Sequence, residues 1–225
     1  KPGEVGGGEA DRATRGALTT PGTNKPLAIL DMGAGSTDAS IISEDGTIHS
    51  IHLAGAGNMV TLLIQSELGL DSFDTAEDVK KYPMAKVESL FHIRHENGTV
   101  EFFPTPLDPN IFAKVVILKE GKMLPLEGDW SMERIRLIRR QAKQKVFVTN
   151  AIRALTRVSP TGSVRDIRFV VLVGGSALDF EVPQMVTDAL SQYKVVAGRG
   201  NIRGSEGPRN AVATGLVLSV LEGRA

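Results

Sequence analysis

The sequence predicts an α/β fold, in which a mixed β-sheet with flanking helices carries a small α+β insertion. Apolar runs of strand length alternate with stretches that have helical periodicity. The run Arg168–Val173 is almost continuously apolar, which is typical of a central strand covered on both faces. Three short strand-like segments near the start follow one another without a helix between them, which favours a meander.

Composition excludes several classes of function. Among the 225 residues, 26 are Lys or Arg and 26 are Asp or Glu, so the formal net charge is zero. This balance argues against a nucleic-acid partner and against an anionic membrane surface. There is no cysteine, which excludes disulfides and thiolate metal sites and favours a cytoplasmic protein. We expect no membrane span and no signal peptide, and because the chain does not begin with Met we expect a piece of a longer protein.

The stretch that organises the chain is Leu27–Ile42, in which an apolar run ends at Asp31, bends through small residues and leaves as a second strand. Glycine permits positive φ and close backbone approach to a ligand, and hydroxyl groups add donors. Asp31 stands where a carboxylate could hold Mg²⁺, directly or through water. The stretch is either a phosphate-binding bend or an ordinary glycine hairpin. The candidate phosphate contacts are Gly33, Gly35, Ser36 and Thr37.

Before the middle of the chain, the pattern predicts a connector, three strands and two helices. Residues 1–26 form the connector, and Glu44-Asp45-Gly46 is a turn. The strands are Leu27–Asp31, Asp38–Ser43 and Thr47–Leu53, and the helices run from about Met59 to Leu68 and from Asp74 to Pro83. The glycine-rich turn before Met59 either cradles an anion at the helix N-terminus or simply packs a strand against a helix.

The middle of the chain changes character. Residues 84–129 are interrupted by prolines and contain two β-like runs, Thr99–Phe103 and Ala113–Leu118, which indicates a small insertion outside the main sheet. A single long helix is predicted over Met132–Arg157. Basic residues around its apolar stripe form either a solvated face or a phosphate or adenine contact.

A second junction of strand, glycines and helix follows. The strand Arg168–Val173 ends in Gly174-Gly175-Ser176, and Phe180–Gln192 has helical spacing. Tyr193–Ala197 is predicted as an edge strand, and a last helix begins at Pro208.

Several familiar motifs are absent. The sequence has no P-loop, no G-x-G-x-x-G, no His-Glu-x-x-His and no Gly-x-Ser-x-Gly. Two histidine pairs, His49 with His52 and His92 with His95, have a spacing that can hold a metal on a helix. Without a carboxylate cluster nearby, we interpret them as surface histidines.

Three loops stand in one order: the bend after Asp31, the Gly174-Gly175-Ser176 junction, and Gly207–Gly215. This order resembles the second half of the actin, Hsp70 and sugar-kinase ATPase superfamily, whose core is ribonuclease H-like. The resemblance implies an actin-like half made of residues 27–83 and 130–225, with 84–129 inserted.

Further segments resemble the large subunit of diol or glycerol dehydratase-reactivating factor, in its C-terminal part. These segments are Leu27–Ile42, Leu53–Met59, Lys86–Phe91, Arg140–Lys143 and Gly200–Gly204. The resemblance implies a chaperone-like ATPase that uses ATP or ADP with Mg²⁺ to release damaged cobalamin from an adenosylcobalamin-dependent dehydratase. Its implied partners are a small (beta) subunit, that dehydratase and the N-terminal remainder of the large subunit. The implied location is the cytoplasm, with a bacterial microcompartment as a second setting.

Carried over residue by residue, the resemblance gives Asp31 the role of the catalytic, Mg²⁺-associated carboxylate. It implies that the first bend contacts the β- or γ-phosphate and that Gly174, Gly175 and Ser176 pass beside ribose and adenine. It also implies nucleoside contacts from Lys143 and Gln144. Two departures stand out: Ala177, Leu178 and Asp179 follow where relatives carry an arginine that stacks on the base, and the superfamily's first phosphate loop is absent.

Two other functions fit the same residues. One is a small-molecule kinase of this superfamily, although no substrate pocket or catalytic base can be located in the sequence. The other is a non-enzymatic, nucleotide-binding scaffold or filament-like protein.

Overall fold

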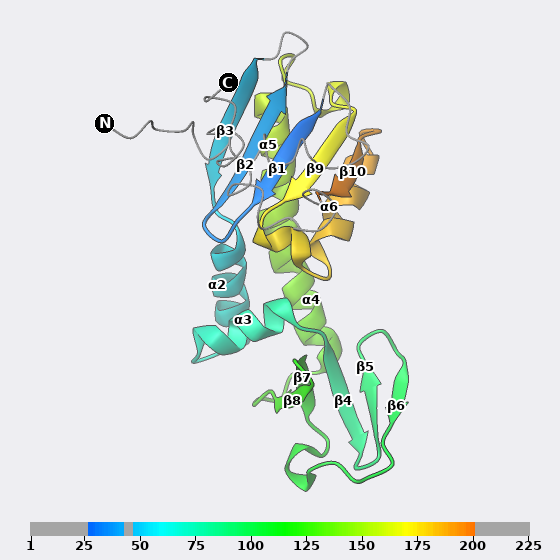
Figure 1. The fold of residues 1–225 in the computed structure, drawn as a ribbon. Coiled ribbons are helices and arrows are strands. Elements are labelled where there is room, and N and C mark those ends of the chain that lie inside the picture. Colours follow the sequence, from blue (N-terminus) through cyan, green and yellow to red (C-terminus); the bar gives the residue numbers. More distant parts are fainter. Residues whose placement is uncertain (1–26, 43–46, 201–225) are drawn as a thin grey trace, which may run out of the picture. The chain divides into compact units, whose positions relative to one another are not determined.

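A computed structural model describes residues 27–42 and 47–200 (Figure 1). Within them the chain divides into two units. The first unit runs up to Met59 and resumes at Gln144, and the second is Val60–Lys143. The predicted connector 1–26, the turn at Glu44–Gly46 and the helix from Pro208 lie outside the described residues.

The first unit is built on a five-stranded mixed sheet in the order β10-β9-β1-β2-β3. β1 pairs with β2 and β2 with β3 in antiparallel fashion, whereas β1, β9 and β10 run parallel. The mixed sheet confirms the predicted fold class. The strand bounds are β1 (Ala28–Met32), β2 (Ser36–Ile42), β3 (Ile48–Ala54), β9 (Phe169–Val173) and β10 (Val196–Arg199).

The apolar sequence of β1 and β9 explains their central position. Every residue of β1 except Asp31 is buried, and Val170–Val173 of β9 are buried as well. Two helices pack on this sheet: α5 (Thr149–Val158) against β1, β2 and β3, and α6 (Val182–Ser191) against β10 (Figure 1). Two short 3₁₀ turns, η3 (Val164–Asp166) and η4 (Gly175–Leu178), stand before and after β9.

The predicted single helix over Met132–Arg157 is wrong in one respect, because the structure divides it. α4 (Met132–Lys143) is followed by a π-helical turn, η2 (Gln144–Val148), and then by α5. The three consecutive residues Val146, Phe147 and Val148 are all buried. Since three successive side chains cannot share one face of a regular α-helix, a wider turn is the conformation that buries them together.

The second unit combines helices with an antiparallel sheet in the order β6-β5-β4-β7-β8. The helices are α2 (Gly57–Leu68), which begins at the end of the first unit, α3 (Phe73–Lys81) and α4, with the 3₁₀ turn η1 (Pro109–Ile111). The strands are β4 (Met84–Ser89), β5 (His92–His95), β6 (Val100–Phe102), β7 (Val115–Lys119) and β8 (Lys122–Pro125).

The five strands all lie between residues 84 and 129, the range expected for the insertion. The boundaries of the insertion as a domain stay a prediction. Only β6 and β7 correspond to the two β-like runs seen in the sequence. β4 and β5 have mixed polarity and β8 is only four residues long, so tertiary pairing rather than local pattern defines these strands.

A buried ionic network links α2 and α3. Lys80 is 7% exposed, and its Nζ lies 2.8 Å from Oγ1 of Thr61 and 2.6 Å from Oε2 of Glu77. Thr61 also donates to Glu77, and Lys81 pairs with it at 2.7 Å. Burial would raise the pKa of Glu77, but the hydrogen bonds from Lys80, Lys81 and Thr61 outweigh that effect and lower it to about 2.

We expect Glu77→Gln to lower the free energy of unfolding of the second unit by about 2 kcal/mol, because Lys80 would keep its charge without a counter-charge. Because the pKa is depressed, the contribution of Glu77 is present above its unfolded value of 4.5 and is lost as pH falls toward about 2. Trp130, the one tryptophan of the sequence, lies in this unit and reports its urea unfolding. The parent and the variant should differ less in free energy of unfolding near pH 2 than at neutral pH. If the difference were the same at both pH values, the stabilising role of the Glu77 carboxylate would be contradicted.

No helix in the part of the chain that the structure describes has the length and apolar character needed to cross a bilayer.

Candidate functional site

Two glycine bends lie side by side at one end of the first unit's sheet. We name residues 33–35 and 174–176 the paired bends. β1 and β9 run parallel with Asp31 opposite Val173, so the chain leaves both strands at the same edge. The hydroxyl of Ser176 donates to the carbonyl oxygen of Gly33 at 3.3 Å. Residues that are about 140 positions apart in sequence are thereby joined.

Gly174 passes directly beside the end of β1. Its φ of +88° lies in the left-handed region, where side chains are strained. A Cβ at this position would collide with Oδ1 of Asp31 and would lie 2.7 Å from the carbonyl oxygen of Met32. Only glycine therefore allows the β9 bend to pass directly beside the Asp31 carboxylate.

The start of α2 holds the first bend by its carbonyl groups. The N–H groups of Gly55, Gly57 and Asn58 donate to the carbonyls of Gly35, Gly33 and Ala34 at 2.9, 3.2 and 2.8 Å. The amides that begin α2 are thus used within the protein. This arrangement supports strand-to-helix packing, rather than an anion cradle, for the turn before Met59.

Two amides of the first bend have no acceptor among the described residues. Ala34 and Gly35 are exposed, and no hydrogen bond from their N–H groups to a described residue is present. Adjacent backbone N–H groups in a turn bind an anion when they turn toward the same side.

The two hydroxyl groups predicted to contact phosphate at the first bend already donate hydrogen bonds within the protein. Thr37 is fully buried and donates to the carbonyl of Gly55 at 3.2 Å, an oxygen that also accepts from Asn150 of α5. Ser36 is half-buried and donates to Oδ2 of Asp38 at 3.0 Å. Contact of either hydroxyl with a phosphate would require these hydrogen bonds to be exchanged.

Asp31 has an acidic partner across the sheet, Asp38, to which the sequence motif assigns no role. Asp31 and Asp38 are direct partners in the β1–β2 register, and His52 of β3 is the next partner in the row. Nδ1 of His52 lies 2.5 Å from Oδ1 of Asp38. Carboxylates directly opposite one another repel, so a cation is favoured between them. In a hairpin that pairs Met32 with Thr37, the next pair outward is Asp31 with Asp38, so the hairpin register could have identified this pair.

The two remaining predicted residues belong to other elements of the chain. Lys143 is fully buried at the end of α4, in the second unit, and Gln144 is exposed at the start of the π-helical turn, in the first. Their contact with a nucleoside stays a prediction.

The histidine pairs are on strands rather than helices. His49 and His52 belong to β3, and His92 and His95 to β5. His92 lies 3.2 Å from Glu88, and His95 lies 2.8 Å from Glu101. Among the described residues no group of three or more His, Cys, Asp or Glu side chains gathers to hold a metal.

The mixed sheet with its paired bends defines one half of an actin-like ATPase fold. The crystal structure of MreB5 of Spiroplasma citri bound to ADP superposes on 97% of this chain and 62% of its own, with a TM-score of 0.58 at 23% identity. A family model described as "Diol dehydratase reactivase ATPase-like domain" matches residues 1–220, and the chain belongs to that family.

Relatives and solved structures of the same family are much more similar. The chain is 68% identical over 216 residues to the propanediol dehydratase-reactivating factor large subunit of Salmonella typhimurium and to the diol dehydratase-reactivating factor large subunit of Klebsiella michiganensis. Each match covers 96% of this chain but 35% of the relative, so the chain spans about a third of their length. A solved glycerol dehydratase reactivase has a TM-score of 0.90 and 66% identity, over 97% of this chain and 36% of its own.

Proposed function

We propose that the paired bends form half of a socket for ATP or ADP. The amides of Ala34 and Gly35 would bind the β- or γ-phosphate, with Gly33, Ser36 and Thr37 shaping the bend around them. Gly174, Gly175 and Ser176 would pass beside ribose and adenine. The observation that carries this proposal is the approach of Gly174 to Asp31, which places the two bends at one point.

The acidic pair fits a magnesium ion. Mg²⁺ in proteins is commonly held by one or two carboxylates together with water and substrate phosphates. Asp31, directly or through water, and Asp38 would supply that share of the ligands, with His52 orienting Asp38. When bound, the ion would offset phosphate charge; the protein's own part is to hold both carboxylates on adjacent strands.

We further propose that the whole protein is a chaperone-like ATPase that reactivates an adenosylcobalamin-dependent diol or glycerol dehydratase by nucleotide-dependent release of damaged cobalamin. Family membership and the names of its relatives support this proposal. The proposed partners are the small (beta) subunit, the dehydratase and the N-terminal remainder of the large subunit. The proposed location is the cytoplasm or a bacterial microcompartment, and the proposed domains are 27–83 with 130–225, plus the insertion 84–129.

A nucleotide can drive such a cycle only if it binds two states of the factor with different affinity. We therefore expect ATP and ADP to differ in how strongly the whole factor binds the inactivated dehydratase. Capture of that dehydratase on immobilised factor, with ADP and then with ATP, measures this difference. Equal capture with both nucleotides, or calorimetry that detects no binding of either, would contradict the proposal.

We expect the 225-residue chain alone to hydrolyse ATP poorly, at least about 100-fold more slowly than the whole factor, because phosphate charge is normally clamped from both sides. Phosphate release by the purified chain and by the factor, measured side by side, tests this. Turnover by the chain alone that matches the factor and is abolished by Asp31→Asn would refute the half-socket.

A further inference from the structure

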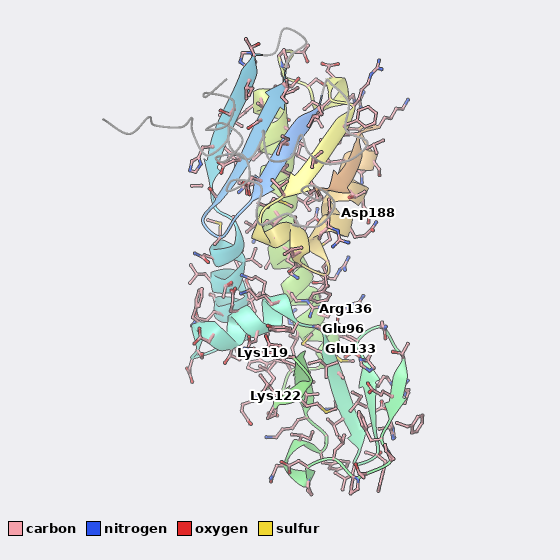
Figure 2. All side chains as sticks on the ribbon, in the orientation of Figure 1. Glu96, Lys119, Lys122, Glu133, Arg136 and Asp188 are labelled. Carbon is pink, nitrogen blue, oxygen red and sulfur yellow. The ribbon has the colours of Figure 1, made fainter. Side chains whose placement is uncertain are left out.

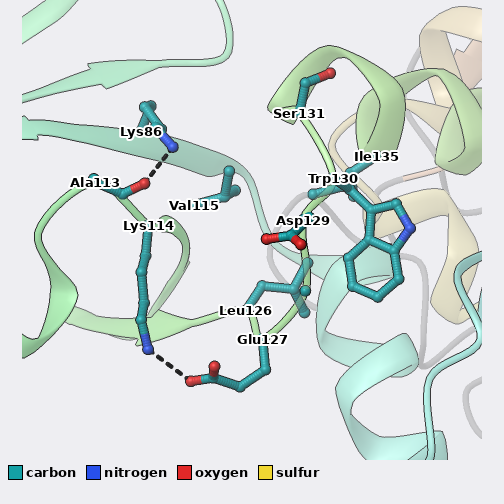
Figure 3. Close-up of a pocket in the computed structure, with 11 residues that line it drawn as sticks. Lys86, Ala113, Lys114, Val115, Leu126, Glu127, Asp129, Trp130, Ser131 and Ile135 are labelled. Carbon is teal, nitrogen blue, oxygen red and sulfur yellow. Dashed lines mark hydrogen bonds and ion pairs between the residues drawn. The ribbon is translucent and has the colours of Figure 1, made fainter.

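A cavity of about 470 Å³ lies entirely within the second unit, away from the paired bends in sequence (Figure 3). The segment between β8 and α4 forms one wall, and the β4 and β7 strands with the loop before β7 form the other. Val115, Leu126 and Ile135, each at most 5% exposed, give it an apolar base. Its volume is within the roughly 300–1,000 Å³ of small-ligand pockets.

Two opposite charges face this cavity without neutralising one another. Nζ of Lys86 donates to the carbonyl of Ala113, and among the described residues no carboxylate pairs with it. The carboxylate of Asp129 has neither an ionic nor a hydrogen-bonding partner in the described part of the chain, and Figure 3 shows it between Lys86 and Trp130. By contrast, Lys114 and Glu127 pair with each other at 2.8 Å. One cation and one anion therefore remain for a ligand.

The walls of the cavity are fixed by unusual backbone. Ala113, whose carbonyl holds Lys86, has a φ of +61°, which is uncommon for a residue with a side chain. Gly128 has a φ of +128°, and the ring of Trp130 lies so close over it that no Cβ would fit. Backbone strain such as that at Ala113 persists where the surroundings require it, and it is frequent at ligand sites.

We propose that this cavity binds a zwitterion whose ammonium and carboxylate groups stand at opposite ends of an apolar stem. The ammonium would meet Asp129, the carboxylate would meet Lys86, and the stem would lie on the apolar base beside Trp130, as aliphatic stems of lysine do on apolar surface. A free ω-amino acid and the C-terminal lysine of a polypeptide share this chemistry.

Trp130 makes the site directly observable, because it is the single tryptophan of the chain. The 225-residue chain is titrated with 6-aminohexanoate while tryptophan fluorescence is followed, and the same titration is made with pentylamine and with hexanoate. We expect the fluorescence to change and to saturate with 6-aminohexanoate. Pentylamine and hexanoate, which carry a single charge, should each bind at least about tenfold more weakly. Equal response to all three probes, or no response to any of them, overturns the proposal.

Matched substitutions locate the ligand. Asp129→Asn and Lys86→Met should each weaken 6-aminohexanoate binding about tenfold or more. Asp71→Asn and Lys122→Met, exposed residues of the same unit outside the cavity (Lys122 is labelled in Figure 2), should leave binding unchanged. Circular dichroism confirms that each variant is folded. Parent-like binding by the Asp129 and Lys86 variants overturns the assignment.

The source of the ligand is decided by a second pair of probes. A short peptide that ends in lysine is compared with the same peptide whose terminal carboxylate is an amide. Binding of the acid form alone assigns the site to a polypeptide terminus. Binding of 6-aminohexanoate with neither peptide assigns it to a free zwitterion.

Discussion

Replacing Gly174 by alanine is expected to destabilise the first unit by about 3 kcal/mol and to abolish nucleotide binding by the whole factor. The added methyl group would stand in a left-handed conformation and would overlap both the Asp31 carboxylate and the Met32 carbonyl. Backbone atoms form part of that collision, so relief would require the β9 bend to move away from β1. Urea unfolding followed by circular dichroism measures the first effect, and calorimetric titration with Mg·ADP the second.

Gly198→Ala is the matched control. Gly198 is exposed on β10 of the same sheet, and an added Cβ there meets nothing within 4 Å. We expect a change in stability of less than about 1 kcal/mol and unaltered nucleotide affinity. If the Gly174 and Gly198 variants had the same stability and the same affinity for Mg·ADP, the close approach of the two bends would not be required for nucleotide binding.

Asp31→Asn in the whole factor should reduce Mg²⁺-dependent ATP hydrolysis by about 100-fold while leaving the fold intact. Asparagine keeps the shape of the side chain beside Gly174 but removes the negative charge proposed for the ion. The loss should therefore be concentrated in the Mg²⁺-dependent reaction, and binding of ADP without the metal should change little. Steady-state phosphate release at increasing Mg²⁺ concentration separates these effects.

Asp188→Asn serves as the control for charge. Asp188 is an exposed residue of α6 (Figure 2), where it accepts a hydrogen bond from Gln184 at 2.6 Å. This variant should hydrolyse ATP at the parent rate. Activity of Asp31→Asn within about twofold of the parent would exclude Asp31 as the carboxylate that serves the ion.

The main sheet could be predicted from sequence because its strands carry strong local signals. β1 and β9 are almost wholly apolar, and glycines end both of them, so fold class and the two bends were evident. The insertion was less predictable. β4 is held in register by pairing with β5 and β7, and β5 by pairing with β4 and β6, while their mixed polarity gives no alternating pattern.

Side-chain direction at the site could not be predicted from the motif. Thr37 has the residue type of a phosphate ligand, yet its place on β2 turns its hydroxyl toward Gly55 and the core. Asp38 lies one residue further along, on the opposite face, where it meets His52. The alternation of side chains along β2 therefore decides whether Thr37 or Asp38 can reach a ligand. Which face each residue takes depends on the strand register, and that register is fixed by pairing with the neighbouring strands.

Whether the paired bends form half of an adenine-nucleotide socket can be seen in a crystal structure of the whole large subunit with Mg·ADP. We expect phosphate density against the amides of Ala34 and Gly35, the ion beside Asp31, and the nucleoside along Gly174–Ser176. Nucleotide bound elsewhere, with both bends facing empty solvent, would contradict it.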